Sequence, residues 1–207
     1  MKAKKVFVSL TVLLMLLPSC TWGVKENRDQ PADNKWLQSL VCQFPCWENI
    51  IPQKTIYEDA FSILRQASIE ASFANEREIS FHSQDNIYGS VSKATDGTVN
   101  TIILFVDQQK LRIEDVLQIL GSPGKIALVQ IPFDSAHCEA DIVFPNHGTI
   151  LELYLEDNGL ENTCGIEVNA DSQVYRVLLL GNIDESEFWK YYANLDFMEW
   201  KGYGEYP

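Results

Sequence analysis

The sequence predicts an α+β fold in which two tandem helix-plus-antiparallel-sheet repeats form one two-layer α/β domain. Residues 53–64 and 109–120 align without a gap, with six identities in twelve positions. A glycine turn, Asp96-Gly97-Thr98-Val99 or His147-Gly148-Thr149-Ile150, follows each copy and leads into an alternating run. Because one amphipathic helix covers only a few strands, we expect the two units to join edge to edge. Helices would then lie on one face of the sheet, and the outer face would be exposed.

The chain opens with the pattern of an export signal. Lys2, Lys4 and Lys5 precede an almost wholly apolar run over residues 6–17, and small or turn-forming residues follow. At 1.5 Å per residue this run covers roughly 18 Å, against ~30 Å of hydrocarbon in a bilayer. The run is therefore too short to stay in the membrane as a spanning helix.

The end of this run carries a recognisable motif. Leu17-Pro18-Ser19-Cys20 resembles the lipobox of bacterial lipoproteins, with a leucine three residues before the cysteine and a small residue directly before it. The resemblance implies that residues 1–19 are a lipoprotein signal peptide and that the Cys20 sulfur is acylated. The mature protein would then be lipid-anchored in the cell membrane, on its extracytoplasmic face. The alternative is an ordinary secretory signal in which Cys20 is unmodified.

Charge limits the classes of partner. Removing residues 1–19 takes away three lysines and no acid, which changes the formal net charge from −13 to −16. Such a chain has no basic stripe with which to displace counterions from phosphates, so no nucleic-acid partner is expected. The acidity is sufficient to keep an exported protein soluble, and a specific cationic partner is the alternative.

The polar, proline-interrupted residues 20–34 predict a flexible tether between the lipid and a single α/β domain over 35–207. Within that domain we place repeat one at about 50–107, repeat two at about 108–183, and a C-terminal helix and tail at 184–207. A short amphipathic helix over 36–41 opens the domain.

Four cysteines besides Cys20 indicate two disulfides in an oxidising compartment. Of the three possible pairings we prefer Cys42 with Cys46 and Cys138 with Cys164, because Pro45 turns the short Cys42–Cys46 segment back on itself. Trp47 is expected to pack over the first disulfide. A metal site would need His137 and His147 with the later cysteines. The paired spacings typical of zinc ligands are absent from the sequence, so no metal or other cofactor is predicted.

The two repeated segments are predicted to be short helices. Thr55 and Glu58 have the spacing of a capping box at the first helix, and Gly121 with Pro123 supplies a stop after the second. Ala60, Phe61 and Leu64, and then Val116, Leu117 and Leu120, form the expected buried stripes. Alternation predicts strands at residues 78–82, 87–93, 101–106, 125–131, 140–144, 150–155 and 173–180.

The second repeat resembles a known family. Val116-x-x-x-Leu120-Gly121-x-Pro123, followed by Phe144-x-x-x-Gly148-x-Ile150, is similar to the helix-and-hairpin signature of the SmpA/OmlA lipoproteins. Its doubling resembles the tandem architecture of the secreted β-lactamase inhibitor protein, and Pro45-Cys46-Trp47-Glu48 resembles a segment of uncharacterised bacterial lipoproteins. These resemblances imply a fold and an envelope-assembly role, and no binding residue transfers.

Catalytic patterns are sparse. Asp134, Ser135 and His137 are too close in sequence to converge as a triad, which normally draws on separate parts of a fold. An enzyme would need a pocket in which Asp134, His137 or Glu139 converge. The segment 157–161 could hold calcium, but it lacks a full ligand ladder and indicates a turn.

Aromatic residues are concentrated at the C-terminus. Asp184 can cap a helix over 184–195 whose aromatics pack in the core. Trp200, Tyr203 and Tyr206 form a possible partner surface. The sequence thus predicts a membrane-anchored lipoprotein that acts as a protein-interaction or envelope-assembly module and is not an enzyme. A cell-wall enzyme or glycan-binding module is the alternative.

The lipid anchor can be tested on the full chain. Replacing Cys20 by alanine should abolish incorporation of a radioactive fatty acid, since the acyl acceptor sulfur is removed. Cys42→Ala, the matched control, should still take up label. A labelled Cys20→Ala variant would refute the anchor.

Overall fold

The computed structural model describes residues 45–106, 111–130, 138–155, 166–181 and 195–206. All of them belong to one compact unit, residues 31–207. The predicted signal peptide, tether, first helix over 36–41 and helix over 184–195 lie in residues outside the described ranges, apart from Leu195. Within those ranges no helix has the length and apolar character needed to cross a membrane.

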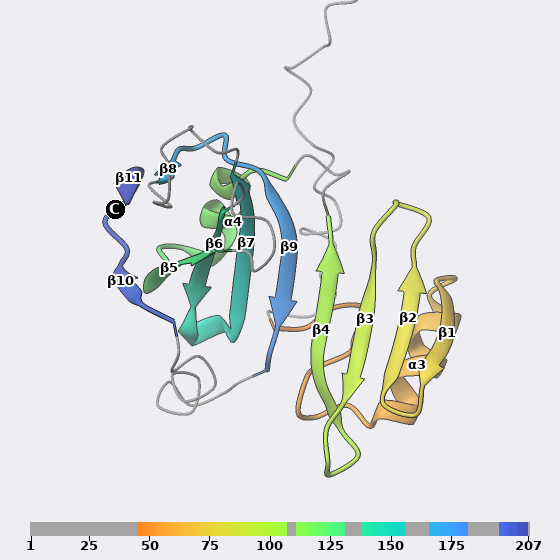
Figure 1. Cartoon of the computed structure of the whole chain (residues 1–207). Coiled ribbons are helices and arrows are strands. Elements are labelled where there is room, and N and C mark those ends of the chain that lie inside the picture. Colours follow the sequence, from red (N-terminus) through yellow and green to blue (C-terminus); the bar gives the residue numbers. More distant parts are fainter. Residues whose placement is uncertain (1–44, 107–110, 131–137, 156–165, 182–194, 207) are drawn as a thin grey trace, which may run out of the picture. The chain divides into compact units, whose positions relative to one another are not determined.

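A nine-stranded antiparallel sheet dominates the fold (Figure 1). Its spatial order is β1-β2-β3-β4-β9-β7-β6-β5-β10. The strands are β1 (Glu70–Asn75), β2 (Glu78–His82), β3 (Tyr88–Lys93), β4 (Val99–Phe105), β5 (Lys125–Gln130), β6 (Cys138–Phe144), β7 (Thr149–Leu155), β9 (Val174–Leu179) and β10 (Phe197–Glu199). A separate two-stranded ribbon pairs β8 (Ile166–Val168) with β11 (Gly204–Tyr206).

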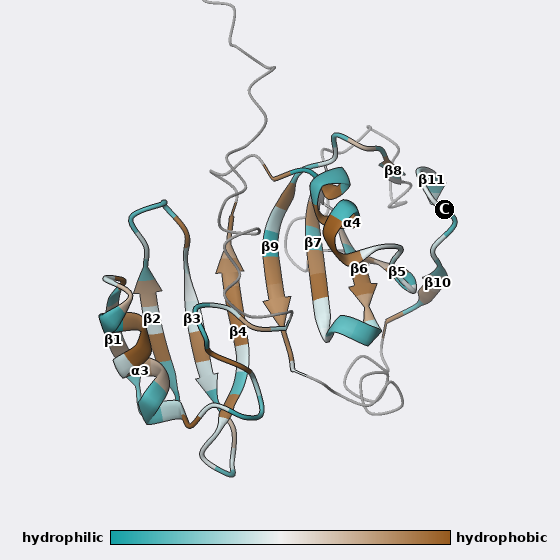
Figure 2. Ribbon diagram, turned by 180° about the vertical axis from the view of Figure 1, so that it is seen from behind, coloured by the Kyte–Doolittle hydropathy of each residue, from teal (hydrophilic) through white to brown (hydrophobic). Residues whose placement is uncertain are grey.

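Two helices cover one face of the sheet, α3 (Tyr57–Gln66) and α4 (Ile113–Leu120). Phe61 of α3 stacks on Phe73 of β1, with ring centroids 4.5 Å apart. Leu120 of α4 lines a pocket together with Phe144 of β6. The strand register places both phenylalanines in one cross-strand row: Phe73, Ile79, Val91, Ile102, Leu179, Thr149 and Phe144. Residues in such a row share a face, so both helices lie on this inner face (Figure 2).

The predicted fold class is wrong. The protein is predominantly β, and it is not an α+β domain of two tandem helix-plus-sheet repeats. The two described α-helices have only ten and eight residues. One continuous sheet takes strands from both of the predicted repeats. The final long strand, β9, pairs with β4 on one side and β7 on the other, so no boundary between two sheets exists.

Most individual strands agree with the alternation. β2 has the predicted bounds, and β3, β4, β5, β6, β7 and β9 differ from the predicted ranges by two residues at most at either end. Sequence patterns missed β1, β8, β10 and β11, which are short or have few apolar residues.

The helix starts differ from prediction. Thr55 does not cap α3, because its Oγ1 accepts a hydrogen bond from the Ile51 amide at 2.8 Å, and Ile56 is the N-cap residue. Glu58 forms an ion pair with Lys93 instead. At α4 the N-cap residue is Arg112, whose backbone N–H and guanidinium both donate to the Asp115 carboxylate. Gly121 ends α4 with φ of 78°, in agreement with the predicted stop.

The segment before α3 is fixed to the core by Trp47. This side chain is buried and stacks on Phe81 of β2 at 4.7 Å. Glu48 and Asn49 take positive φ values of 50° and 66° in the tight turn that follows. Cys46 is buried and disulfide-bonded. The side chain of its partner is not among those that the structure describes, so the pairing with Cys42 stays a prediction.

Close approach of two glycines ties the start of β7 to the end of β9. Gly148 has φ of 50°, and a Cβ there would lie 1.7 Å from the Gly181 carbonyl oxygen. The Leu180 amide donates to the Gly148 carbonyl at 2.8 Å. No residue other than glycine fits at position 148 without moving the backbone.

Replacing Gly148 by alanine should therefore lower the free energy of unfolding by about 3 kcal/mol or more, through both the positive φ and the clash. Gly97→Ala is the control: Gly97 also has positive φ, but a Cβ added there would have no atom within 4 Å. That variant should lose only about 1 kcal/mol. Urea denaturation compares the two, and equal losses would contradict the close approach.

Candidate functional site

The outer face of the sheet carries a cross-strand row of polar and aromatic residues. We call this the outer row, and it consists of His82, Tyr88, Phe105, Arg176, Glu152 and Asp141. Both described α-helices lie on the opposite face (Figure 2). Small hydroxyl residues, Ser72, Ser80, Ser90, Ser92 and Thr101, occupy neighbouring outer positions of β1 to β4.

The middle of the outer row is a three-membered stack. The rings of Tyr88 and Phe105 are 4.9 Å apart and inclined by 5°. The Arg176 guanidinium carbon lies 5.7 Å from the Phe105 ring centroid, which is within cation–π range. Tyr88 is 40% exposed and the other two side chains are half-buried. The stack therefore presents rigid aromatic surface without a long flexible side chain at its exposed end.

Beyond Arg176 the row enters a cluster of three carboxyl groups. Glu152 forms an ion pair with Arg176. The Tyr175 hydroxyl lies 2.8 Å from Glu152 Oε2 and 2.5 Å from Glu139 Oε1. A hydroxyl has one hydrogen and can donate to one carboxylate at a time. Glu152 and Glu139 therefore compete for the one hydrogen of the Tyr175 hydroxyl.

Asp141 is the carboxyl group of this cluster whose ionised form is most disfavoured by its surroundings. It is 8% exposed, and its Oδ1 has no hydrogen-bond partner. Burial, and then the neighbouring Glu152 and Glu139, raise the pKa of Asp141 to about 7. Burial also raises the pKa of Glu152, although Arg176 opposes the shift. Near neutral pH the cluster thus holds fewer negative charges than its three carboxyl groups would suggest.

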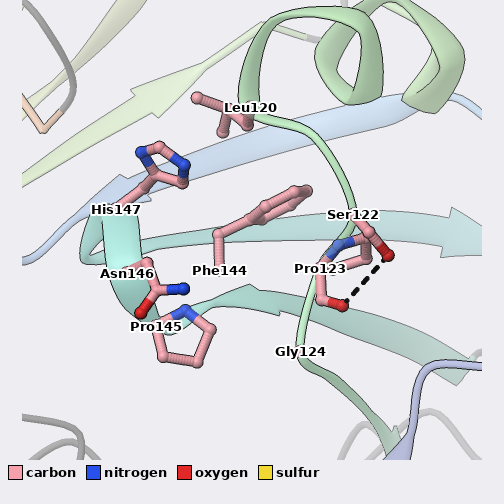
Figure 3. A pocket seen from close by; sticks show the side chains of 8 residues that line it. All are labelled: Leu120, Ser122, Pro123, Gly124, Phe144, Pro145, Asn146 and His147. Carbon is pink, nitrogen blue, oxygen red and sulfur yellow. Dashed lines mark hydrogen bonds between the residues drawn. The ribbon is translucent and has the colours of Figure 1, made fainter.

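A pocket of about 340 Å³ lies on the other face, between the end of α4 and the 3-10 helix η3 (Pro145–His147) (Figure 3). It is lined by Leu120, Ser122, Pro123, Gly124, Phe144, Pro145, Asn146 and His147. His147 is the only lining side chain that can act as a general base, and no carboxylate lines the pocket to orient it. The residues that line the pocket therefore do not form a catalytic triad.

The structure separates the residues named from sequence. Asp134, His137, Cys20, Cys42 and Cys164 lie outside the described residues, as does the segment 157–161. Cys138 begins β6. Glu139 belongs to the carboxyl cluster on the outer face, away from His147 in the pocket. In the described part of the chain, no group of three or more His, Cys, Asp or Glu side chains is arranged to hold a metal ion.

The C-terminal aromatics occupy three environments. Tyr206 is buried in the core, and its hydroxyl donates to the Gly202 carbonyl at 2.7 Å. Trp200 is half-buried and stacks on Tyr206, with ring centroids 5.9 Å apart. Tyr203 is 47% exposed. Of the three, Tyr203 offers the largest exposed fraction to a partner.

Sequence reasoning missed the outer row. Each member alternates with the inner-face residues of its strand, so the sequence indicates only that it points away from the apolar side of that strand. Their convergence depends on pairings such as Phe105 with Arg176 that link distant segments.

Comparisons with known proteins identify no family. No protein-family model matches this sequence, and no curated protein matches it. Among solved structures, the crystal structure of a DUF4309 family protein (YjgB) from Bacillus subtilis subsp. subtilis str. 168 has a TM-score of 0.39 and 16% sequence identity. That match covers 63% of this chain and 80% of the other.

The cluster predicts a pH dependence that Asp141→Asn removes. The folded-state pKa of Asp141, about 7, lies above its ordinary value of 3.8, so the folded state binds the proton more tightly between these values. The Asp141 contribution to stability should thus fall as pH rises from about 4 to about 7, by at most roughly 4 kcal/mol. In Asp141→Asn the denaturation free energy should be flatter over this window and higher than wild type at pH 8.

Glu205→Gln, which changes an exposed carboxylate, is the control and should follow the wild-type profile. Urea denaturation at several pH values measures all three proteins. Parallel profiles for wild type and Asp141→Asn would contradict the buried-carboxyl interpretation.

Proposed function

We propose that this chain is a lipid-anchored extracytoplasmic binding protein that contacts a protein partner of the cell envelope through its outer sheet face. The observation that carries the proposal is the stack of Tyr88, Phe105 and Arg176 on that face. Tyrosine and arginine are enriched among the residues that dominate protein interfaces, and rigid side chains lose little entropy on binding. The anchor at Cys20 comes from the lipobox resemblance.

The surroundings of the stack favour a binding role over catalysis. The side chains beside the stack are small hydroxyl residues that project only a short way from the sheet. A partner can therefore approach the aromatic rings. Arg176 is already neutralised by Glu152, so its guanidinium contributes a planar surface more than a net charge. The described pocket is on the opposite face and carries His147 without an orienting carboxylate.

Affinity capture from envelope extracts tests this function. The detergent-solubilised lipoprotein should retain a reproducible protein partner, and the Tyr88→Ala/Phe105→Ala variant should lose it. Truncating interface hot spots costs at least 1 kcal/mol each, so affinity should fall by at least about tenfold. Tyr203→Ala, which alters an exposed aromatic of the tail, should retain the partner.

Circular dichroism must show that the double variant is folded. Capture that is equal for the double variant and wild type would contradict the outer-face proposal. Retention of cell-wall polysaccharide in place of a protein would favour the glycan-binding alternative and overturn the choice of partner.

A further inference from the structure

Strand β1 forms a free edge of the nine-stranded sheet. It is the first strand in the sheet order and pairs with β2, and no described strand pairs with its other side. Five of its six residues are exposed. A free edge presents unpaired amide and carbonyl groups, which another extended chain can satisfy.

The edge also carries exposed aromatic surface. Phe73 is 53% exposed, the largest value among the exposed large hydrophobic residues of the described chain. It stacks on Phe61 of α3, so its ring is held in place. Residues 70–73 of β1, which precede a bulge between Phe73 and Asn75, include neither lysine nor proline, two residues that commonly block pairing at an edge.

The sequence of β1 is complementary to itself. When two copies pair antiparallel about a twofold axis at Ser72, Ser72 lies opposite Ser72 and Ala71 lies opposite Phe73. A small side chain then receives a large one at two equivalent places on the inner face. Glu70 would face the bulge at Ala74, so no like charges face each other within the strand.

Other twofold registers fit less well. An axis at Glu70 would place two Glu70 carboxylates directly opposite each other. An axis at Ala71 would move Phe73 opposite Ile69, beyond the start of the strand. Registers shifted by one residue would turn the inner face of one copy towards the outer face of the other.

We propose that a second copy of this chain pairs with β1, antiparallel and centred on Ser72, to form a dimer with one continuous sheet. The two outer faces would then join through their serine-rich strands, with helices on the opposite side. This inference is independent of the partner proposed above.

Cysteine cross-linking of the full chain tests both the pairing and its register. Directly opposite residues have Cβ atoms about 4.5–5.5 Å apart, so Ser72→Cys should form a covalent dimer under mild oxidation. Ser80→Cys places a thiol on the same face of β2, the next strand of the sheet. In the dimer the two thiols introduced there would be separated by both β1 strands. Non-reducing electrophoresis should show a dimer for Ser72→Cys and little for Ser80→Cys or wild type.

Sedimentation equilibrium of the wild type and Phe73→Glu provides a second test that needs no added thiol. The dimer dissociation constant of Phe73→Glu should be at least tenfold higher than that of the wild type. A charged side chain there replaces the aromatic ring that faces Ala71 of the second copy. A wild type that stays monomeric at the highest concentration tested would overturn the proposal. Equal cross-linking of Ser72→Cys and Ser80→Cys would overturn the register and therefore the proposal.

Discussion

The pairing of β9 with β4 and with β7 is the interaction on which the rest of the structure depends. β9 comes late in the chain but lies in the middle of the sheet, where it satisfies backbone groups on both of its sides. Removing it would expose two edges and leave two small sheets with one short helix each. The close approach of Gly148 and Gly181 fits the same constraint, because it fastens the end of β9 to the turn that begins β7.

A continuous sheet gives the protein two chemically different faces. The inner face packs apolar side chains under α3 and α4 in one cluster that extends from Ile79 to Ile142. The outer face carries polar members of the same strands together with a small apolar cluster of Val143, Ile150 and Leu180. β9 brings Phe105 of the first half beside Arg176 of the second. The contact between the Phe105 ring and the Arg176 guanidinium therefore exists only because the two halves share one sheet. The proposed binding face thus lies beside a group of interacting carboxyl groups. The charge of this group changes near neutral pH, because the pKa of Asp141 is about 7.

Local features were predictable from sequence, and long-range ones were not. Alternation located β2 because one of its sides is buried and the other is more exposed. Strand β1 escaped because nearly all of its positions are exposed and its Ala, Ser and Asn residues have weak strand preference. The fold class was wrong because periodicity does not reveal that β9 pairs with β4, whose residues lie 71 to 77 positions earlier in the chain. The outer row was missed for the same reason: Phe105 and Arg176 become neighbours only when β4 and β9 are placed in register.

Native-state hydrogen exchange of the β9 amides tests the shared sheet most directly. If β9 joins the two halves, the central amides of Val174–Leu179 should be among the slowest to exchange, with the same opening free energy as those of β4 and β7. Early exchange of β9, or an opening of β1 to β4 while β5 to β7 stay protected, would contradict the account.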